Sequence, residues 1–281
     1  MIVNDRAERF RRLHQPDAGS ILVLPNVWDA MSARIVEEAG ARALATTSAG
    51  VSWSLGRRDG ERLTREEMIG VVRRIVSAVQ VPVTADVEGG YGSGSPGDVA
   101  ETVRAVIAAG AAGINLEDTS SRDSQSLIRS SAQAERLEAA RQAAEAEGVP
   151  LFINARTDAY LFGIGEPATR FDDTVRRARI YKEAGADGIF VPGVTDAATI
   201  ERLVQAIEAP LNILASPGAP STSELRQLGV ARVSIGGALT RSAMAHIRTV
   251  AEELLRDGTY ESLRGGIAFG DADGLFAPVK Q

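Results

Sequence analysis

The chain has 281 residues, of which 44% are hydrophobic and 24% charged, and its formal net charge is −6. This composition is typical of a soluble globular protein with enough apolar side chains for a closed core, and the acidic balance argues against nucleic acid and membrane surfaces as partners. The absence of cysteine excludes disulfides, thiolate metal sites and cysteine nucleophiles.

Histidine and lysine are also scarce. The two histidines argue against a His-rich zinc site and a Ser-His-Asp triad, and we expect His14 on the surface and His246 in a structural role. Lys182 and Lys280 are poorly placed for a Schiff base. The charged N-terminus lacks the apolar core of a secretory signal, and no apolar run is long enough to span a membrane, so we expect a cytoplasmic protein.

The chain begins with a polar leader, for which we expect a helix at about 4–14, and then alternates between short apolar runs and longer amphipathic stretches. Most of the apolar runs have no polar alternation, as expected of parallel strands buried on both faces. The segments EEAGARALA, IAAGAAGIN and KEAGADGIF repeat one pattern, in which a helix ends at a glycine and a strand soon follows. The predicted strands are 21–26, 43–50, 81–88, 113–118, 151–157, 188–193, 211–216 and 232–237.

This repetition favours an α/β fold, namely a (β/α)8 TIM barrel with a short N-terminal helix and a C-terminal helical extension. No GxGxxG motif follows the first strand, which argues against a doubly wound sheet. We expect a single domain that comprises a leader (1–18), the barrel (20–257) and a Gly-rich tail (258–281), which is either free or in contact with another subunit.

The active site of such a barrel lies at the C-terminal ends of the strands, and acidic residues gather there. Asp59 follows the second strand, Asp86 and Glu88 end the third, and Glu117 ends the fourth. Asp86 and Glu88 are two residues apart, so on a strand their side chains share a face. Carboxylates at one mouth raise one another's pKa unless a cation neutralises them, and an all-oxygen ligand set favours Mg²⁺ or Mn²⁺. The alternative is that these are surface or helix-capping acids.

Two further features face the same mouth. Arg156 ends the fifth strand, where it is either a counter-ion for the carboxylates or a clamp for a substrate carboxylate. The backbone N–H groups of Thr47, Ser48 and Ala49 are candidates to receive an oxyanion, although helix or turn capping explains that stretch equally well.

These residues resemble the isocitrate lyase/phosphoenolpyruvate mutase superfamily. The matching pieces are, in order, PNVWDAMSARIVEEAG, TTSAGVSWSLGRRDG, TADVEGGYG, GINLEDT and INARTDAY, and the resemblance extends over about 20–245. It implies a (β/α)8 barrel, dependence on Mg²⁺, and action on 2-oxo or 2-hydroxy carboxylates through a pyruvate-enolate-like intermediate. It also implies a homotetramer in which the last helices are exchanged between neighbouring subunits.

The resemblance also implies roles for single residues. By position, Glu88 is similar to the direct metal ligand of the family, and Asp86 and Glu117 to carboxylates that hold metal-coordinated water. Asp59 resembles the carboxylate beside the metal and the reaction centre, and Arg156 resembles the clamp for the substrate carboxylate. Further positions similar to substrate contacts are Thr47, Ser48, Ala49 and Asn212, and Tyr91 is a candidate general acid or base.

The departures from the family narrow the reaction. Isocitrate and methylisocitrate lyases carry a KKCGH loop, whereas this chain has no cysteine and reads EDTSSRDSQSLIRS after the fourth strand. Members that act on phosphonopyruvate have a lysine and an asparagine where this chain has Ser121, Arg122 and Asp123. We therefore expect a carbon–carbon lyase or decarboxylase of the oxaloacetate or 2-methylmalate type. The alternatives are a phosphonomutase similar to carboxyphosphonoenolpyruvate mutase and a 2-oxo-acid-binding protein with little turnover.

Overall fold

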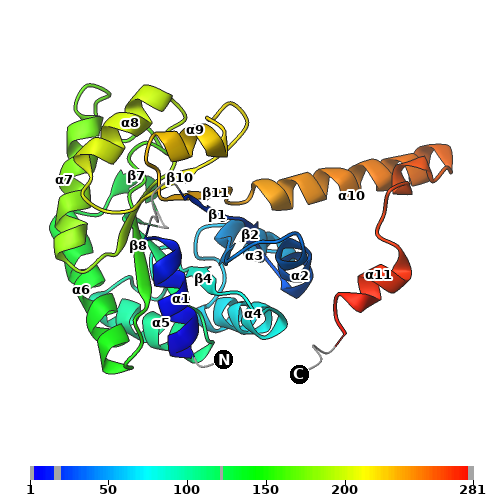
Figure 1. The fold of residues 1–281 in the computed structure, drawn as a ribbon, viewed down its shortest axis with the longest axis horizontal. Coiled ribbons are helices and arrows are strands. Elements are labelled where there is room, and N and C mark those ends of the chain that lie inside the picture. Colours follow the sequence, from blue (N-terminus) through cyan, green and yellow to red (C-terminus); the bar gives the residue numbers. More distant parts are fainter. Residues whose placement is uncertain (1–2, 16–19, 121–122, 278–281) are drawn as a thin grey trace.

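The computed structural model describes residues 3–15, 20–120 and 123–277, and its centre is a nearly closed barrel of nine parallel strands (Figure 1). The strands follow one another around the ring in the order β1-β11-β10-β9-β8-β5-β4-β3-β2. Their bounds are β1 Leu22–Leu24, β2 Asn26–Val27, β3 Leu44–Thr46, β4 Val83–Asp86, β5 Gly113–Glu117, β8 Phe152–Arg156, β9 Gly188–Val191, β10 Leu211–Leu214 and β11 Arg232–Ser234.

The ring is completed at Pro25, which separates β1 from β2. β1 pairs with β11, whereas β2 pairs with β3. Proline has no N–H to donate to a ladder, but its carbonyl still accepts a 3.1 Å hydrogen bond from the N–H of Ala45. The predicted strand 21–26 is therefore two short strands with different neighbours, and the predicted (β/α)8 barrel is confirmed.

Helices cover the outside of the barrel, and several begin where the sequence offers a capping residue. Asp29, Thr64 and Ser221 each form a capping box, and Ser95 caps a helix whose first residue is Pro96. The helices are α1 Val3–Leu13, α2 Ala30–Glu38, α3 Ser48–Ser54, α4 Arg65–Ala78, α5 Pro96–Ala108, α6 Ser130–Ala146, α7 Arg170–Glu183, α8 Ala197–Ala206, α9 Thr222–Gln227, α10 Ala238–Asp257 and α11 Phe269–Gly274, with a short 3₁₀ turn at Glu261–Leu263.

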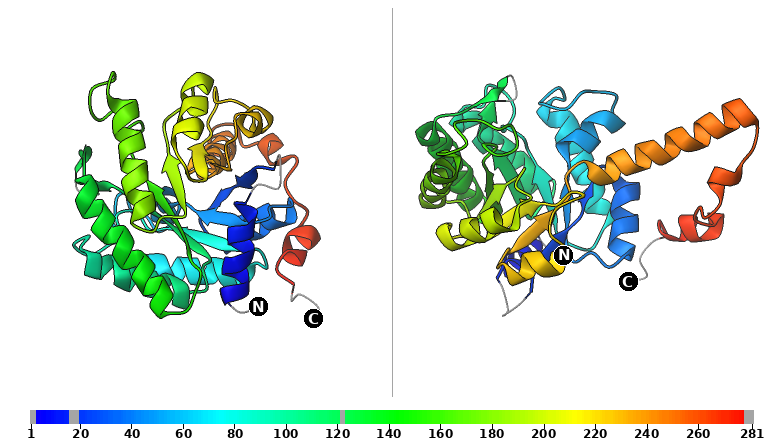
Figure 2. Two further views of the ribbon diagram at one scale, coloured as in Figure 1. Left: turned by 60° about the vertical axis from the view of Figure 1, so that its left-hand side comes forward. Right: turned by 90° about the horizontal axis from the view of Figure 1, so that it is seen from above.

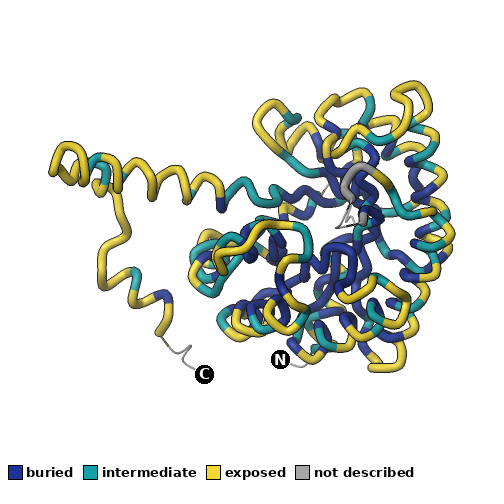
Figure 3. The backbone as a smooth tube through the Cα atoms, turned by 180° about the vertical axis from the view of Figure 1, so that it is seen from behind, coloured by how far each residue is buried: buried dark blue, intermediate teal, exposed yellow. Residues whose placement is uncertain are grey.

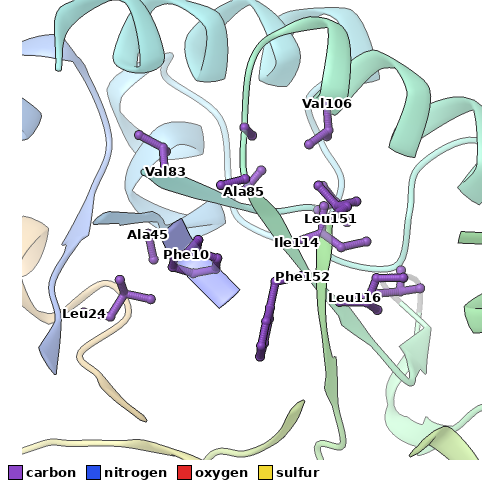
Figure 4. Packing of buried hydrophobic residues seen from close by; sticks show 14 of the residues in the cluster. Phe10, Leu24, Ala45, Val83, Ala85, Val106, Ile114, Leu116, Leu151 and Phe152 are labelled. Atoms are coloured by element: carbon purple, nitrogen blue, oxygen red, sulfur yellow. The ribbon is translucent and has the colours of Figure 1, made fainter. Parts of the chain in front are cut away.

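The leader helix α1 closes the end of the barrel opposite to the C-terminal strand ends. Its Phe10 is fully buried and lies edge-on to Phe152 of β8, among apolar residues of β3, β4 and β5 (Figure 4). His14 stacks on the same Phe152 ring with centroids 3.8 Å apart, and its side chain is 3% exposed. The expectation that His14 lies on the surface was wrong, because the C-terminal end of α1 turns this ring into the barrel.

Two predicted strands end earlier than expected. The strand predicted at 43–50 ends at Thr46, and Thr47 caps α3 instead. The strand predicted at 81–88 ends at Asp86, and Glu88 follows with a left-handed backbone (φ 50°). Asp86 and Glu88 therefore do not share a strand face. In the unassigned loop after β5, β6 (Thr119–Ser120) pairs with β7 (Asp123–Leu127), and Ser121 and Arg122 lie outside the described residues.

The helix α10 has 20 residues and extends away from the barrel, as two views show (Figures 1 and 2). Most of its length and the segment after it are exposed (Figure 3). Apolar side chains are among the exposed ones, such as Ile247 at 67% and Leu255 at 86%. Within the described ranges, no helix is both long and apolar enough to cross a membrane.

Candidate active site

A small polar cavity of about 150 Å³ lies at the C-terminal ends of the strands. It brings together six of the residues predicted from the sequence, namely Thr47, Ser48, Ala49, Asp59, Asp86 and Arg156. The remaining lining residues are Asn26, Asn115, Phe190, Pro192, Leu214, Ser234, Gly236 and Gly237. The other predicted residues, Glu88, Tyr91, Glu117 and Asn212, are not part of this lining.

The stretch after β3 turns backbone N–H groups toward the cavity because a helix begins there. The Thr47 hydroxyl accepts a hydrogen bond from the N–H of Gly50, and the N–H groups of the first turn of α3 have no helical partner of their own. The Ser48 N–H donates to Oδ2 of Asp86 at 3.2 Å. Thr47 therefore caps α3, which borders the cavity. The N–H of Thr47 donates to the Val27 carbonyl at 3.1 Å and that of Ser48 to Asp86, so Ala49 stays the candidate among the three for an oxyanion donor.

Asp86 is buried at the end of β4. Its N–H donates to the Thr46 hydroxyl at 2.8 Å, and its Oδ2 accepts the Ser48 N–H. Its Oδ1 is buried and has no hydrogen-bond partner among the described residues. A buried carboxylate oxygen without a partner is costly, so this atom marks a position where a cation or a hydrogen-bond donor is needed.

Glu88 follows β4 with a left-handed backbone, and it is not among the residues that line the cavity. Its Oε2 accepts a hydrogen bond of 2.6 Å from the N–H of Glu61, and its Oε1 lies 3.4 Å from the Tyr91 hydroxyl. Burial, followed by the charges of Asp86 and Asp59, raises the pKa of Glu88 to about 8. Glu61 and Tyr91 also have positive φ angles, and strain of this kind gathers at functional sites.

Arg156 lies between two carboxylates. Its Nη1 lies 2.9 Å from Oε2 of Glu117, its Nε donates to Oδ1 of Asp158 at 2.6 Å, and its guanidinium lies 5.7 Å from the centre of the Phe190 ring. Burial disfavours the charge of Arg156, but Glu117 and Asp158 outweigh it and raise its pKa. Burial also raises the pKa of Glu117 well above its usual value, against the opposing charge of Arg156.

Asn212 belongs to an amide network inside the barrel. Asn154 Nδ2 donates to the side-chain oxygens of Asn115 at 2.9 Å and Asn212 at 3.1 Å, and Asn212 Nδ2 donates to the Ser234 hydroxyl at 3.1 Å. The buried Arg232 donates to Asn115 at 3.2 Å. Asn115 and Ser234 line the cavity, so this network supports its floor, and Asn212 is one step removed from it.

Two carboxylates at the cavity, Asp59 and Asp86, are candidates to hold a divalent cation. Partial desolvation, followed by the charge of Asp86, raises the pKa of Asp59, and a hydrogen bond from the Ser48 side chain lowers it. In the part of the chain that is described, no three Asp, Glu or His side chains are arranged to hold a metal by themselves. Mg²⁺ is commonly held by one or two carboxylates and otherwise by water, and the unpartnered Oδ1 of Asp86 with Asp59 nearby fits that mode.

A larger open cleft of about 530 Å³ lies beside the cavity and shares no lining residue with it. It runs between 60–66 and the turn at Tyr91 and Gly92, and half of its lining residues are charged. Tyr91 borders this cleft, and its pKa is raised well above its usual value by burial and by Glu88. Its hydroxyl lies 3.4 Å from Oε1 of Glu88, and its role as a general acid or base stays a prediction.

Some lining residues were missed by the sequence analysis. Asn26 accepts hydrogen bonds from the N–H groups of Ile235 (2.9 Å) and Gly236 (2.8 Å), which joins the first and last strands of the barrel. Asn115 and Ser234 sit inside apolar runs, and a polar residue in a strand buried on both faces is the signal that was available.

Comparison with known proteins agrees with this architecture. The family model for phosphoenolpyruvate phosphomutase matches residues 10–255. An oxaloacetate decarboxylase of a Bradyrhizobium species is 31% identical and covers 89% of this chain and 83% of its own. The 2-methylisocitrate lyase of Escherichia coli is 31% identical over 84% of this chain and 80% of its own.

A solved structure gives the same result. A Burkholderia cenocepacia protein described as a candidate lyase/mutase is 39% identical, with a TM-score of 0.90 and 98% coverage of both chains. The chain belongs to the phosphoenolpyruvate phosphomutase family, within the isocitrate lyase/phosphoenolpyruvate mutase superfamily of enzymes, which includes lyases and mutases.

Proposed function

We propose that the protein is a Mg²⁺-dependent carbon–carbon lyase or decarboxylase that acts on a 2-oxo or 2-hydroxy dicarboxylate, of the oxaloacetate or 2-methylmalate type. The observation that carries this proposal is the single small cavity that places Arg156 beside Asp59, Asp86 and the first turn of α3. The guanidinium of Arg156 can bind an anionic group of the substrate, and the carboxylates of Asp59 and Asp86 can hold a metal ion in the same cavity.

Arg156 supplies the substrate-binding charge. Its Nε is occupied by Asp158 and its Nη1 by Glu117, and it also lines the cavity. The two carboxylates hold the guanidinium plane in one orientation, so a substrate carboxylate meets a fixed donor pair. The Phe190 ring, whose centre is 5.7 Å from the guanidinium, lines the same cavity and offers its face to the positive charge.

In the proposed reaction, the first turn of α3 and the two aspartates would act on the reacting carbons. In oxaloacetate, the C3–C4 bond breaks, CO₂ leaves, and the electron pair moves from C3 to the 2-oxo oxygen as an enolate, after which protonation of C3 gives pyruvate. The N–H of Ala49, in the first turn of α3, is a candidate donor to that oxyanion. Asp86 and Asp59 would hold Mg²⁺, which when bound polarises the 2-oxo group.

The direct test is the formation of pyruvate from oxaloacetate and from 2-methylmalate by the purified protein, with Mg²⁺ and with a chelator. We expect turnover that the chelator abolishes and that Asp86→Asn lowers by about 10² to 10³ in kcat/KM. Asp196→Asn, at an exposed helix cap, is the matched control and should keep wild-type turnover. Activity that persists in Asp86→Asn at the wild-type rate would contradict the proposal.

A phosphonomutase is the second candidate, because the matched family model is that of a phosphomutase and Asp59 offers a carboxylate nucleophile at the cavity. Its test is ³¹P NMR on phosphonopyruvate and related phosphonates. Conversion of a C–P bond, together with no pyruvate from the C4 or C5 acids, would favour it over the lyase. Mg²⁺-dependent binding of 2-oxo acids without any product would instead favour a binding protein.

We also propose that the protein is a homotetramer in which α10 and the following segment exchange between neighbouring subunits. The exposed apolar residues Met244, Ile247, Leu254 and Leu255 repeat at helical spacing along α10. The barrel also has an apolar groove at β1, where Val23 is 46% exposed, and this groove is a candidate surface for the exchanged segment. Exposed apolar surfaces of this kind mark subunit contacts.

A further inference from the structure

One buried carboxylate, Asp158, joins the base of the β6–β7 hairpin to the guanidinium of Arg156. Its Oδ1 accepts the Nε–H of Arg156 at 2.6 Å, and its Oδ2 accepts the hydroxyl of Thr119 at 2.9 Å. Thr119 is the first residue of β6, and Asp158 is fully buried. Each oxygen of this carboxylate thus has one identified side-chain donor, and the two donors come from different parts of the site.

The other end of the hairpin leads to the same place. The Asp158 N–H donates to Oδ1 of Asp118 at 3.1 Å, and the Ile128 N–H, just after β7, donates to the Asp118 carbonyl at 2.7 Å. Asp118 is in turn fixed by the Tyr181 hydroxyl, which donates to its Oδ2 at 2.7 Å. The two ends of the hairpin are therefore hydrogen-bonded to Asp158 and Asp118, which are hydrogen-bonded to each other.

Burial makes this arrangement cooperative. A carboxylate without solvent cannot give up a hydrogen bond at low cost, because the freed oxygen keeps its charge and has no water to replace the donor. If the Thr119 hydroxyl is lost, Oδ2 of Asp158 loses its identified donor, and the carboxylate is held less firmly in its present orientation. Arg156, which donates to Oδ1 of the same carboxylate, is then held less firmly as well.

We propose that Asp158 is a positioning residue that couples the base of the β6–β7 hairpin to the orientation of Arg156. The hairpin and the guanidinium take their places together, and the Thr119 hydroxyl sets how firmly Arg156 is held. The consequence for substrate affinity rests on the proposed function, in which Arg156 binds a substrate carboxylate. The coupling itself does not rest on it.

The coupling is tested by the rate at which phenylglyoxal, a reagent for arginine, modifies Arg156, followed by peptide mass spectrometry. Thr119→Val removes the hydroxyl with little change of shape, and we expect Arg156 to react about tenfold faster, the factor expected when a buried hydrogen bond to a charged group is lost. Thr119→Ser keeps the hydroxyl and should restore the wild-type rate. Thr174→Val is the matched control, because Thr174 is fully buried in α7 and its hydroxyl has no partner among the described residues.

Substitution at Asp158 gives a second comparison. Asp158→Asn keeps an oxygen that can accept from Arg156 and an amide that can donate to Thr119. Arg156 should therefore react with phenylglyoxal more slowly in Asp158→Asn than in Asp158→Ala. If Asp158→Ala does not fold, the comparison of Thr119→Val with Thr119→Ser tests the proposal by itself. An Arg156 rate in Thr119→Val that equals that of Thr174→Val would overturn the proposal.

Ligand binding separates this proposal from the function. We expect the Kd of oxalate, measured by calorimetry with Mg²⁺, to rise about tenfold in Thr119→Val. If the wild-type protein does not bind oxalate, the proposed function fails, whereas the labelling rates still decide the coupling. If labelling rises but the Kd of oxalate is unchanged, Asp158 positions Arg156, and Arg156 does not bind the carboxylate.

Discussion

Nη1 of Arg156 lies 2.9 Å from Oε2 of Glu117, so the arginine that we propose to bind substrate already shares its charge with an acid at the end of the neighbouring strand β5. The guanidinium contacts Glu117 and Asp158 at the same time because its nitrogens form a planar fork. A lysine has a single nitrogen and cannot keep both contacts and also meet a substrate.

We therefore expect Arg156→Lys to raise the KM for oxaloacetate by about 10- to 100-fold, with a smaller change in kcat. The measurement is steady-state formation of pyruvate. Arg176→Lys is the matched control, since Arg176 is an exposed residue of α7 outside the cavity. An unchanged KM in Arg156→Lys would show that the substrate carboxylate binds elsewhere.

Glu88 gives a prediction for the dependence of stability on pH. Its pKa is raised from 4.5 to about 8, first by burial. Between these values the folded protein keeps a proton on Glu88 that the unfolded chain has lost, so the contribution of Glu88 to the free energy of unfolding falls as pH rises through this window. Glu88→Gln removes the titration and can still accept the hydrogen bond from Glu61.

With a chelator present, Glu88→Gln should be more stable than the wild type at pH 8, by on the order of a few kcal/mol, and the difference should shrink toward pH 5. Urea unfolding at both pH values measures it. Glu252→Gln, on the exposed face of α10, should show no such trend. A difference that is constant with pH would mean that Glu88 does not titrate in this range.

The barrel and six of the residues that line the cavity were predictable because their signals are local. Buried parallel strands are continuous apolar runs, so the strands around Ile114 and Ile153 were visible in the sequence, and the residue that ends each run marks the mouth. Asp86 and Arg156 were found in this way. Thr47 to Ala49 were found at the right place, although the stretch begins a helix rather than ending a strand.

The positions that were not predicted depend on the backbone or on distant partners. Glu88 was expected to share the strand face of Asp86, but a φ of 50° redirects it toward Glu61, and nothing in the local pattern specifies that angle. The predicted contact of Asn212 with substrate stays a prediction, but its partner Asn154, on another strand of the barrel, was not predictable from the local sequence. Such partners are set by the register of the whole barrel.

His14 also makes stability depend on pH. Its Nδ1 is 2.9 Å from the Phe10 carbonyl, and burial followed by the charge of Arg232 lowers its pKa from 6.5 to about 3. Between pH 6.5 and about 3 the His14 ring is protonated in the unfolded chain and neutral in the folded protein. The free energy of unfolding therefore falls as the pH drops below 6.5.

We expect His14→Phe, which keeps an aromatic ring against Phe152, to flatten this acid slope by about 1.4 kcal/mol per pH unit between pH 6 and 4. Urea unfolding across this range measures the slope. His246→Phe is the matched control on the exposed face of α10. If the two variants have the same slope as the wild type, the ring of His14 is protonated in the folded protein.

The exposed apolar residues of α10 give a prediction for assembly. Ile247 and Leu255 are 67% and 86% exposed in the single chain, and in an exchanged tetramer they would be buried against a neighbouring subunit. Introducing a charge at a buried apolar contact costs several kcal/mol, because the ion loses its hydration without gaining a partner.

We expect the double variant Ile247→Asp/Leu255→Asp to elute as a smaller species, with its mass measured by light scattering. Arg248→Asp adds the same side chain at a polar position of α10 and should remain a tetramer. A wild-type protein that is monomeric at all concentrations tested would contradict the exchange of α10, and it would leave the cavity, which is formed within one chain, to act alone.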